Sequence, residues 1–141
     1  ELVLVCSPAL AAELGEGPVS VADLADRPLV LPTLAGFAAH SRYRDLMGQA
    51  PLLNVIAELD SAYALVRAVE AGVASTIIGA VAAAELAGGL AVRRLTSPTL
   101  ERELYLWSPA ALPPSAPVRA VKDALHAVLA GMQARLNDRI S

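Results

Sequence analysis

The sequence has 141 residues, of which 55% are hydrophobic and 18% charged, and its net charge at neutral pH is −3. This balance is typical of one folded globular domain and excludes a disordered chain. Because Arg and Lys are few and scattered, no basic patch sufficient for direct DNA binding is expected. No apolar stretch reaches the roughly 18 residues that a membrane-spanning helix needs.

The chain starts directly in an apolar run with no basic segment before it, so we expect a fragment without an export signal. Cys6 is the only cysteine, which excludes an intrachain disulfide. A buried, unreactive thiol in a protein of the reducing cytoplasm is therefore expected. Two arginine pairs, Arg42 with Arg44 and Arg93 with Arg94, are interpreted as ordinary solvated faces.

The first predicted elements are a buried strand and a short helix. The strand covers residues 2–5, and a turn-rich connection over residues 9–17 follows it. A capping-box pattern then begins a helix at Ser20, because Ser20 and Asp23 can each accept a backbone N–H. Pro28 is expected to end this helix.

Strands and helices alternate along the rest of the chain. Strands are predicted at residues 29–31, 52–59, 76–78, 90–95 and 103–107. Helices are predicted at residues 36–48, 62–71, 81–86 and 115–136. The last of these has one apolar side, formed by Val118, Val121, Leu125, Val128, Leu129, Met132 and Leu136. The alternation predicts an α/β fold with βαβ units and a mostly parallel sheet.

Polar residues follow two of the predicted strands. In a parallel sheet, ligands bind at the carboxyl ends of the strands, next to helix N-termini. Thr33 occupies such a place, where its hydroxyl could orient a ligand or only satisfy the backbone. Asp60 and Ser61 occupy another, either as simple helix caps or also as contacts to a polar or anionic ligand.

Residues suited to catalysis are few. His40 and His126 are the only histidines, and neither has further ligands at metal-binding spacing. No phosphate-binding glycine motif and no nucleophile elbow is present. We therefore predict a protein that is not an enzyme and has neither a metal nor a cofactor.

Several segments occur in the order of one family pattern: Asp60-Ser61 before an apolar-faced helix, residues 69–73 (VEAGV) and residues 76–78 (TII). Residues 20–32 (SVADLADRPLVLP) and 89–95 (GLAVRRL) agree as well. Together they resemble the effector-binding domain of LysR-type transcriptional regulators. The resemblance covers essentially the whole chain.

The resemblance implies a periplasmic-binding-protein-like α/β fold, with two βαβ subdomains joined by two crossing strands. Residues 1–141 would be a partial domain: 8–96 the complete second subdomain, and 1–7 and 97–141 remnants of the first. The helix-turn-helix of the family is absent, so DNA would be bound only through an N-terminal domain outside this chain. The implied effector-binding wall consists of Thr33, Leu34, Gly36, Asp60, Ser61, Ile78 and Gly79. Gly79 stands where the family commonly has Pro.

The function that the resemblance implies is effector sensing by a bacterial, cytoplasmic regulator. The effector would be an anionic or polar metabolite, and the regulator would be a homodimer or tetramer without a membrane partner. The helix at residues 37–47 is one candidate for the dimer surface. Two other interpretations stay open, a solute-binding protein of a transporter and a small enzyme on the same fold.

Overall fold

The computed structural model describes residues 1–33, 53–97, 99–100, 106 and 115–139. The predicted helix at residues 36–48 and two of the implied wall residues, Leu34 and Gly36, lie outside the described residues. The predicted strand at residues 103–107 also lies outside them, apart from Leu106.

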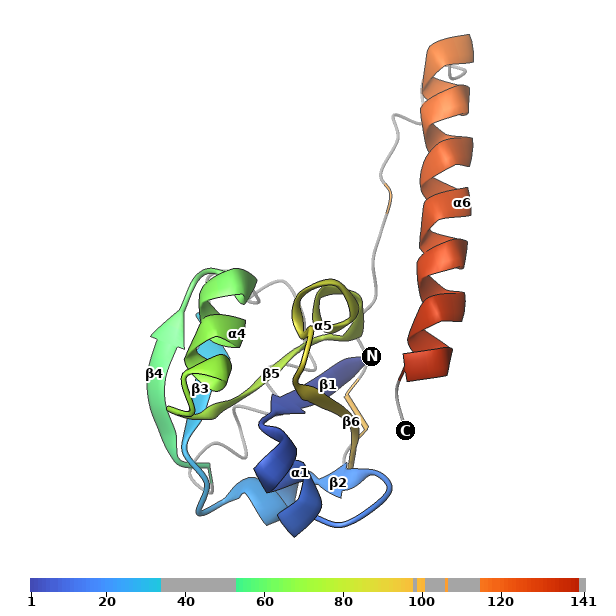
Figure 1. The fold of residues 1–141 in the computed structure, drawn as a ribbon. Coiled ribbons are helices and arrows are strands. Elements are labelled where there is room, and N and C mark those ends of the chain that lie inside the picture. The colour runs from blue at the N-terminus through green and yellow to red at the C-terminus, as the bar shows by residue number, and fades with distance from the viewer. Residues whose placement is uncertain (34–52, 98, 101–105, 107–114, 140–141) are drawn as a thin grey trace.

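The described strands form one six-stranded sheet in the order β2-β6-β1-β5-β3-β4 (Figure 1). They are β1 (Leu2–Cys6), β2 (Val19–Ser20), β3 (Leu29–Pro32), β4 (Val55–Leu59), β5 (Ser75–Gly79) and β6 (Ala91–Thr96). β3 is parallel to β4 and β5, and β2 is parallel to β6. β1 is antiparallel to both of its neighbours, β5 and β6. The sheet is mostly parallel, as predicted, with β1 running against the other five strands.

β1 lies in the middle of the described sheet, where Leu2 pairs with Gly79 and Val3 pairs with both Ile78 and Arg94. The division into two subdomains, with residues 1–7 as a remnant of the first, stays a prediction. All five residues of β1 are buried. A strand that is apolar on both faces needs cover on both sides, and a central position in the sheet supplies it.

The described helices are α1 (Pro8–Glu13), the 3₁₀ helix η1 (Val21–Leu24), α4 (Ala62–Glu70), α5 (Ala80–Leu86) and α6 (Ala116–Arg139). The turn-rich connection predicted at residues 9–17 is wrong over its first half, where α1 forms. The Ser7 hydroxyl accepts the Leu10 N–H at 3.2 Å, and Pro8 stands in the first turn, where proline suits a helix.

The capping box at Ser20 is confirmed. Asp23 accepts the Ser20 N–H at 3.2 Å, and the Ser20 hydroxyl accepts the Ala22 N–H at 3.3 Å. The helix that it begins is a single 3₁₀ turn ending at Leu24, so Pro28 is not what stops it.

β4 begins later than predicted and forms an edge of the sheet. The Val55 N–H donates to the Leu53 carbonyl at 3.0 Å, a tight turn that an extended strand cannot contain. Ile56 on this strand is 49% exposed. Exposure of an apolar side chain is natural here, because only one edge of β4 is paired among the described strands.

Helices cover both faces of the sheet. On one face α4 and α5 contribute Leu65, Val66, Val69, Ala80 and Ala83 to a cluster with Val3, Val5, Val30 and Ile78. On the other face η1 and β2 enclose a cluster with Leu4, Leu29, Leu31, Ile77 and Leu95, against which Leu10 and Leu14 pack. The alternation of inward side chains along β5, with Ile77 on one face and Ile78 on the other, divides the two clusters.

The long helix α6 extends away from this layered body, and only its C-terminal turns come near α5 (Figure 1). The helix and Pro117 in its first turn are as predicted. Five residues of its predicted apolar side are exposed, from 41% at Leu125 and Leu129 to 61% at Val121, whereas Met132 is half-buried. The core of the described protein therefore consists of the sheet and the shorter helices.

Candidate functional site

The ends of several strands meet at one edge of the sheet. β3, β4, β5 and β6 all end there, and β1 begins there because it runs in the opposite direction. We call this the carboxyl edge, defined by Glu1, Thr33, Asp60, Gly79 and Ser97. Parallel α/β sheets bind ligands at such an edge, where helices begin and backbone donors point outward.

Thr33 and Asp60 are brought together at the carboxyl edge, although 26 positions lie between them in the chain. The Thr33 N–H donates to the Leu59 carbonyl at 3.3 Å, which extends the β3–β4 pairing by one residue. The Thr33 hydroxyl then donates to Oδ1 of Asp60. Asp60 is exposed, so this pair presents a carboxylate at the surface of the edge.

Ser61, and not Asp60, is the N-cap of α4. Its hydroxyl accepts the Ala64 N–H at 3.5 Å, and its carbonyl accepts the Leu65 N–H at 3.0 Å. Among the described residues, the N–H groups of Ala62 and Tyr63 have no acceptor, as is usual for the first turn of a helix. Gly72, with a φ of 71°, ends the helix as predicted.

The remaining wall residues differ in their access to the edge. The Ile78 side chain is buried in the core beside α5, with 2% exposure. Gly79 is half-buried and precedes α5 with φ −61°, an angle that proline also adopts. The strand end therefore takes the course that Pro would give it, although Gly stands there.

A second charged pair lies at the carboxyl edge. Arg94 of β6 approaches Glu1 with a distance of 3.7 Å between NH1 and Oε2. The Glu1 carbonyl accepts the Ala80 N–H at 3.0 Å, which ties the beginning of β1 to the first residue of α5. Carboxylates of Glu1 and Asp60 and one guanidinium thus belong to the same edge.

Arg93 is a polar residue whose role the sequence did not reveal. It was interpreted as part of a solvated face, but it is only 9% exposed. Its guanidinium donates to the carbonyls of Gly15 at 2.5 Å, Gly17 at 3.0 Å and Ala11 at 3.4 Å. Its position two residues before buried Leu95 on the same strand was the available signal, because residues at i and i+2 share a face.

The bonds of Arg93 hold the segment between α1 and β2. Gly15 and Gly17 have φ values of 78° and 88°, so the segment turns through conformations that favour glycine. Cys6 is buried and free on the same side of the sheet. Burial raises the pKa of the Cys6 thiol, and the positive charge of Arg93 offsets part of that rise. The predicted buried thiol is confirmed.

A hollow of about 630 Å³ lies beside Arg93, between the start of β6 and residues 11–17. None of the predicted wall residues lines it. The guanidinium at its side already donates to three carbonyls, so we interpret Arg93 as a structural residue.

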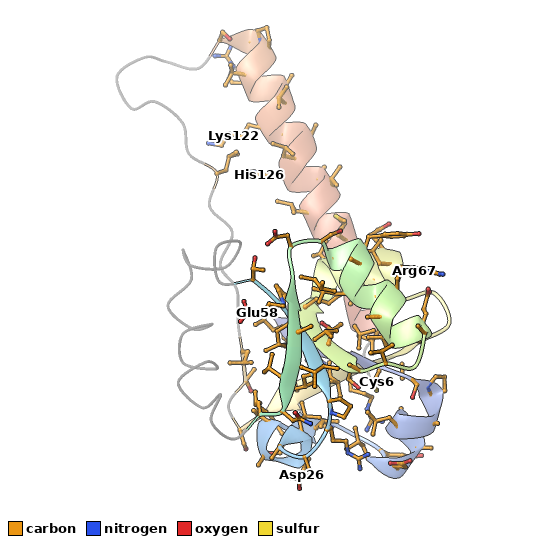
Figure 2. All side chains as sticks on the ribbon, turned by 90° about the vertical axis from the view of Figure 1, so that its left-hand side faces the viewer. Cys6, Asp26, Glu58, Arg67, Lys122 and His126 are labelled. Carbon is orange, nitrogen blue, oxygen red and sulfur yellow. The ribbon has the colours of Figure 1, made fainter. Side chains whose placement is uncertain are left out.

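Among the described residues, no group of three His, Cys, Asp or Glu side chains is placed to hold a metal ion. His126 and Lys122 are exposed and project from the same side of α6 (Figure 2), whereas His40 lies outside the described residues. Within the part of the chain that the structure describes, no helix has the length and apolarity needed to cross a membrane.

The family model of the LysR substrate binding domain matches residues 1–130. The chain belongs to this family. The described sheet, helices and carboxyl edge accordingly represent the periplasmic-binding-protein-like fold of LysR effector domains. No curated protein matches the chain.

Proposed function

We propose that this LysR domain senses a small-molecule effector at the carboxyl edge of its sheet. The observation that carries the proposal is the Thr33–Asp60 hydrogen bond at the point where two parallel strands end. Ser61 and the open N–H groups at the start of α4 lie directly after Asp60. Leu34 and Gly36, next to Thr33 in the chain, and Gly79 beside α5 complete the proposed wall.

The proposed mechanism is a shift between open and closed arrangements of two subdomains. Residues 8–96 with β1 would form one subdomain, and part of residues 97–141 would belong to the other. The chain passes the carboxyl edge at Glu1 and again after Thr96, and the Leu2 N–H donates to the Leu100 carbonyl at 2.7 Å. An effector that contacts both subdomains favours the closed state by its differential affinity.

In a regulator that contains this domain, closure would change the relative placement of attached DNA-binding domains. We propose a cytoplasmic homodimer or tetramer, in which DNA is bound only by a separate N-terminal domain. The family match supports this function over a transport solute-binding protein or a small enzyme on the same fold. We propose no catalytic role, since the polar groups of the edge are explained by capping, pairing and ligand contact.

Thermal unfolding of the protein with a panel of amino acids, carboxylates and amines tests the proposal. An effector at 100 times its Kd should raise the free energy of unfolding by about 2.7 kcal/mol. Thr33→Val and Asp60→Asn should each weaken the binding of such an effector by about tenfold, since each removes a polar contact worth about 1.4 kcal/mol.

Glu70→Gln is the matched control. Glu70 pairs with Arg67 on α4 and lies away from the carboxyl edge (Figure 2 shows Arg67 projecting outward from that helix). This substitution should leave effector affinity unchanged. Equal affinity in Thr33→Val, Asp60→Asn and Glu70→Gln would place the effector elsewhere and overturn the proposal.

A further inference from the structure

A smaller hollow of about 200 Å³ opens at the opposite edge of the sheet. It lies between α1, the residues Arg27 and Pro28 before β3, and residues 72–75 at the start of β5. We call it the Ser75 hollow. Ser75 and Gly79 are the two ends of β5, so about 13 Å of strand separates this hollow from the carboxyl edge.

The hydroxyl of Ser75 is a hydrogen-bond donor at the wall of this hollow. Ser75 is 3% exposed, and its N–H donates to the Pro28 carbonyl at 3.0 Å. Its side chain lines the hollow, and among the described residues no group is hydrogen-bonded to its hydroxyl. A hydroxyl at the wall of an open hollow can donate to whatever occupies that hollow, so a bound molecule that accepts from Ser75 would gain a contact that no described protein group makes.

Two further donors belong to the same hollow. The Ser7 hydroxyl accepts the Leu10 N–H and keeps its own hydrogen to donate. Arg27 donates through NH1 to Oε2 of Glu13 at 2.8 Å. Its Nε and its second terminal nitrogen have no acceptor among the described residues. Glu13 also lines the hollow, with its Oε2 bound and its charge balanced by Arg27. The other polar side chains of the lining are donors.

The rest of the lining is apolar. Val69 is buried with 1% exposure, and Leu10 and Ala74 also face the hollow. A hollow of about 200 Å³ has room for a small organic molecule. Donors from three side chains next to an apolar wall suit a short carboxylate with a small apolar body.

We propose that the Ser75 hollow is a second small-molecule site, which takes a short-chain monocarboxylate. The carboxylate accepts from Ser75, Ser7 and Arg27, and the alkyl part lies against Leu10 and Val69. The site is separate from the carboxyl edge and does not depend on the effector function assigned there.

Butyrate is a suitable probe, with butyramide as its uncharged counterpart of the same shape. In a titration of the ¹⁵N-labelled protein at constant ionic strength, butyrate should give saturable shifts at the amides of residues 72–75 and at Arg27 Nε. The expected Kd is on the order of millimolar for so small a ligand. Butyramide should bind at least about tenfold more weakly, because it lacks the charge that Arg27 recognises.

Variants separate this site from general carboxylate binding. Ser75→Ala and Arg27→Gln should each weaken butyrate binding by about tenfold. Two matched controls should leave it unchanged. Thr76→Val removes the neighbouring buried hydroxyl, which has no hydrogen-bond partner among the described residues and faces the α4–α5 side of the sheet. Arg67→Gln removes the guanidinium of the surface pair with Glu70.

Shifts that do not saturate, or equal butyrate affinity in Ser75→Ala and Thr76→Val, would overturn the proposal. Saturable shifts confined to Thr33, Asp60 and Ser61 would also overturn it, and they would instead support a carboxylate effector at the carboxyl edge. If Asp60→Asn lost its response to the effector but still bound butyrate, the Ser75 hollow would be a site independent of the carboxyl edge.

Discussion

Arg93 and Arg94 are neighbours on β6, yet they serve two different regions of the molecule. Arg93 points to one face of the sheet and binds the carbonyls of the α1–β2 segment, residues 8–20. Arg94 points to the other face and approaches Glu1 at the carboxyl edge. In the first region a buried guanidinium bonds to several half-buried or exposed carbonyls, whereas in the second the Arg94–Glu1 pair is half-buried and Asp60 is exposed. Buried bonds of this kind stabilise a fold, and exposed ones remain available to a ligand.

The difference should appear in stability measurements. A hydrogen bond from a charged donor contributes about 1.5–3 kcal/mol, and loss of Arg93 would remove the donor of three carbonyls at once. An exposed ion pair contributes about 0–1 kcal/mol. Four predictions, from the largest expected effect to the smallest, test whether the two regions differ in this way.

The largest effect is expected for Arg93→Met. The substitution keeps an apolar side chain of similar reach but leaves the carbonyls of Ala11, Gly15 and Gly17 without their donor. We expect the free energy of unfolding to fall by about 3 kcal/mol, measured by urea denaturation. Arg94→Gln, on the adjacent residue, should cost less than about 1 kcal/mol. Equal losses in the two variants would contradict the contrast between the regions.

A smaller effect is expected at the carboxyl edge for Ser61→Ala. It removes the N-cap of α4 and should lower the free energy of unfolding by about 1 kcal/mol in the same measurement. Asp60→Ala should cost less than about 0.5 kcal/mol, because Asp60 is exposed and accepts only from Thr33 among the described residues. If Asp60→Ala were the more costly change, Asp60 would be the cap and its proposed role toward a ligand would weaken.

A further effect is confined to alkaline pH. The pKa of Cys6 is raised above its ordinary value of 9.0 by burial, so the folded protein keeps the thiol proton more tightly than the unfolded chain does. The contribution of Cys6 is therefore fully present below pH 9 and is lost as the pH rises from about 9 toward the folded pKa. Urea denaturation at pH 8 and pH 10 should show a decline that Cys6→Ala reduces. An unchanged decline in Cys6→Ala would assign it to other groups.

The smallest effects are expected for two exposed ion pairs that involve helix residues, Arg27 with Glu13 of α1 and Arg67 with Glu70 of α4. Arg27→Gln removes the pair with Glu13, and Arg67→Gln removes the pair with Glu70. Each should change the free energy of unfolding by no more than about 0.5 kcal/mol, and the difference should shrink at 1 M salt because exposed pairs are screened. A cost above 1 kcal/mol for Arg27→Gln would show that this pair anchors α1 to the body of the domain.

Local patterns in the sequence predicted the elements that depend on local chemistry. The capping box at Ser20, the helix between Ser61 and Gly72, and the buried strand of β5 all follow from neighbouring residues. The helix α1 was missed because Gly15 and Gly17 made the whole stretch look like turns, although Ser7 and Pro8 form a good helix start. Strand β4 was predicted too long because its apolar pattern continues through the turn at Leu53.

The candidate site could be predicted only as far as local sequence patterns and the family resemblance reach. Thr33, Asp60 and Ser61 stood out because each follows a strand, and family resemblance added Ile78 and Gly79. Their pairing could not be read from either source. The contact between Thr33 and Asp60 depends on β3 and β4 being neighbours in register, which is a property of the assembled sheet. The burial of Ile78 likewise depends on the position of α5 over β5.

The sequence by itself determined the α/β class, most of the strands and helices, the absence of an intrachain disulfide and the family of the domain. The class, the elements and the absence of a disulfide follow from hydrophobic periodicity, helix caps and the cysteine count, and the family follows from the resemblance of the ordered segments. Only the tertiary structure decided that β1 lies in the middle of the sheet, that Arg93 is buried while Arg94 is not, and that Ser75 opens onto a hollow. Each of these depends on which distant strands pair and in which direction, and the free energy of such pairings is distributed over residues far apart in the chain.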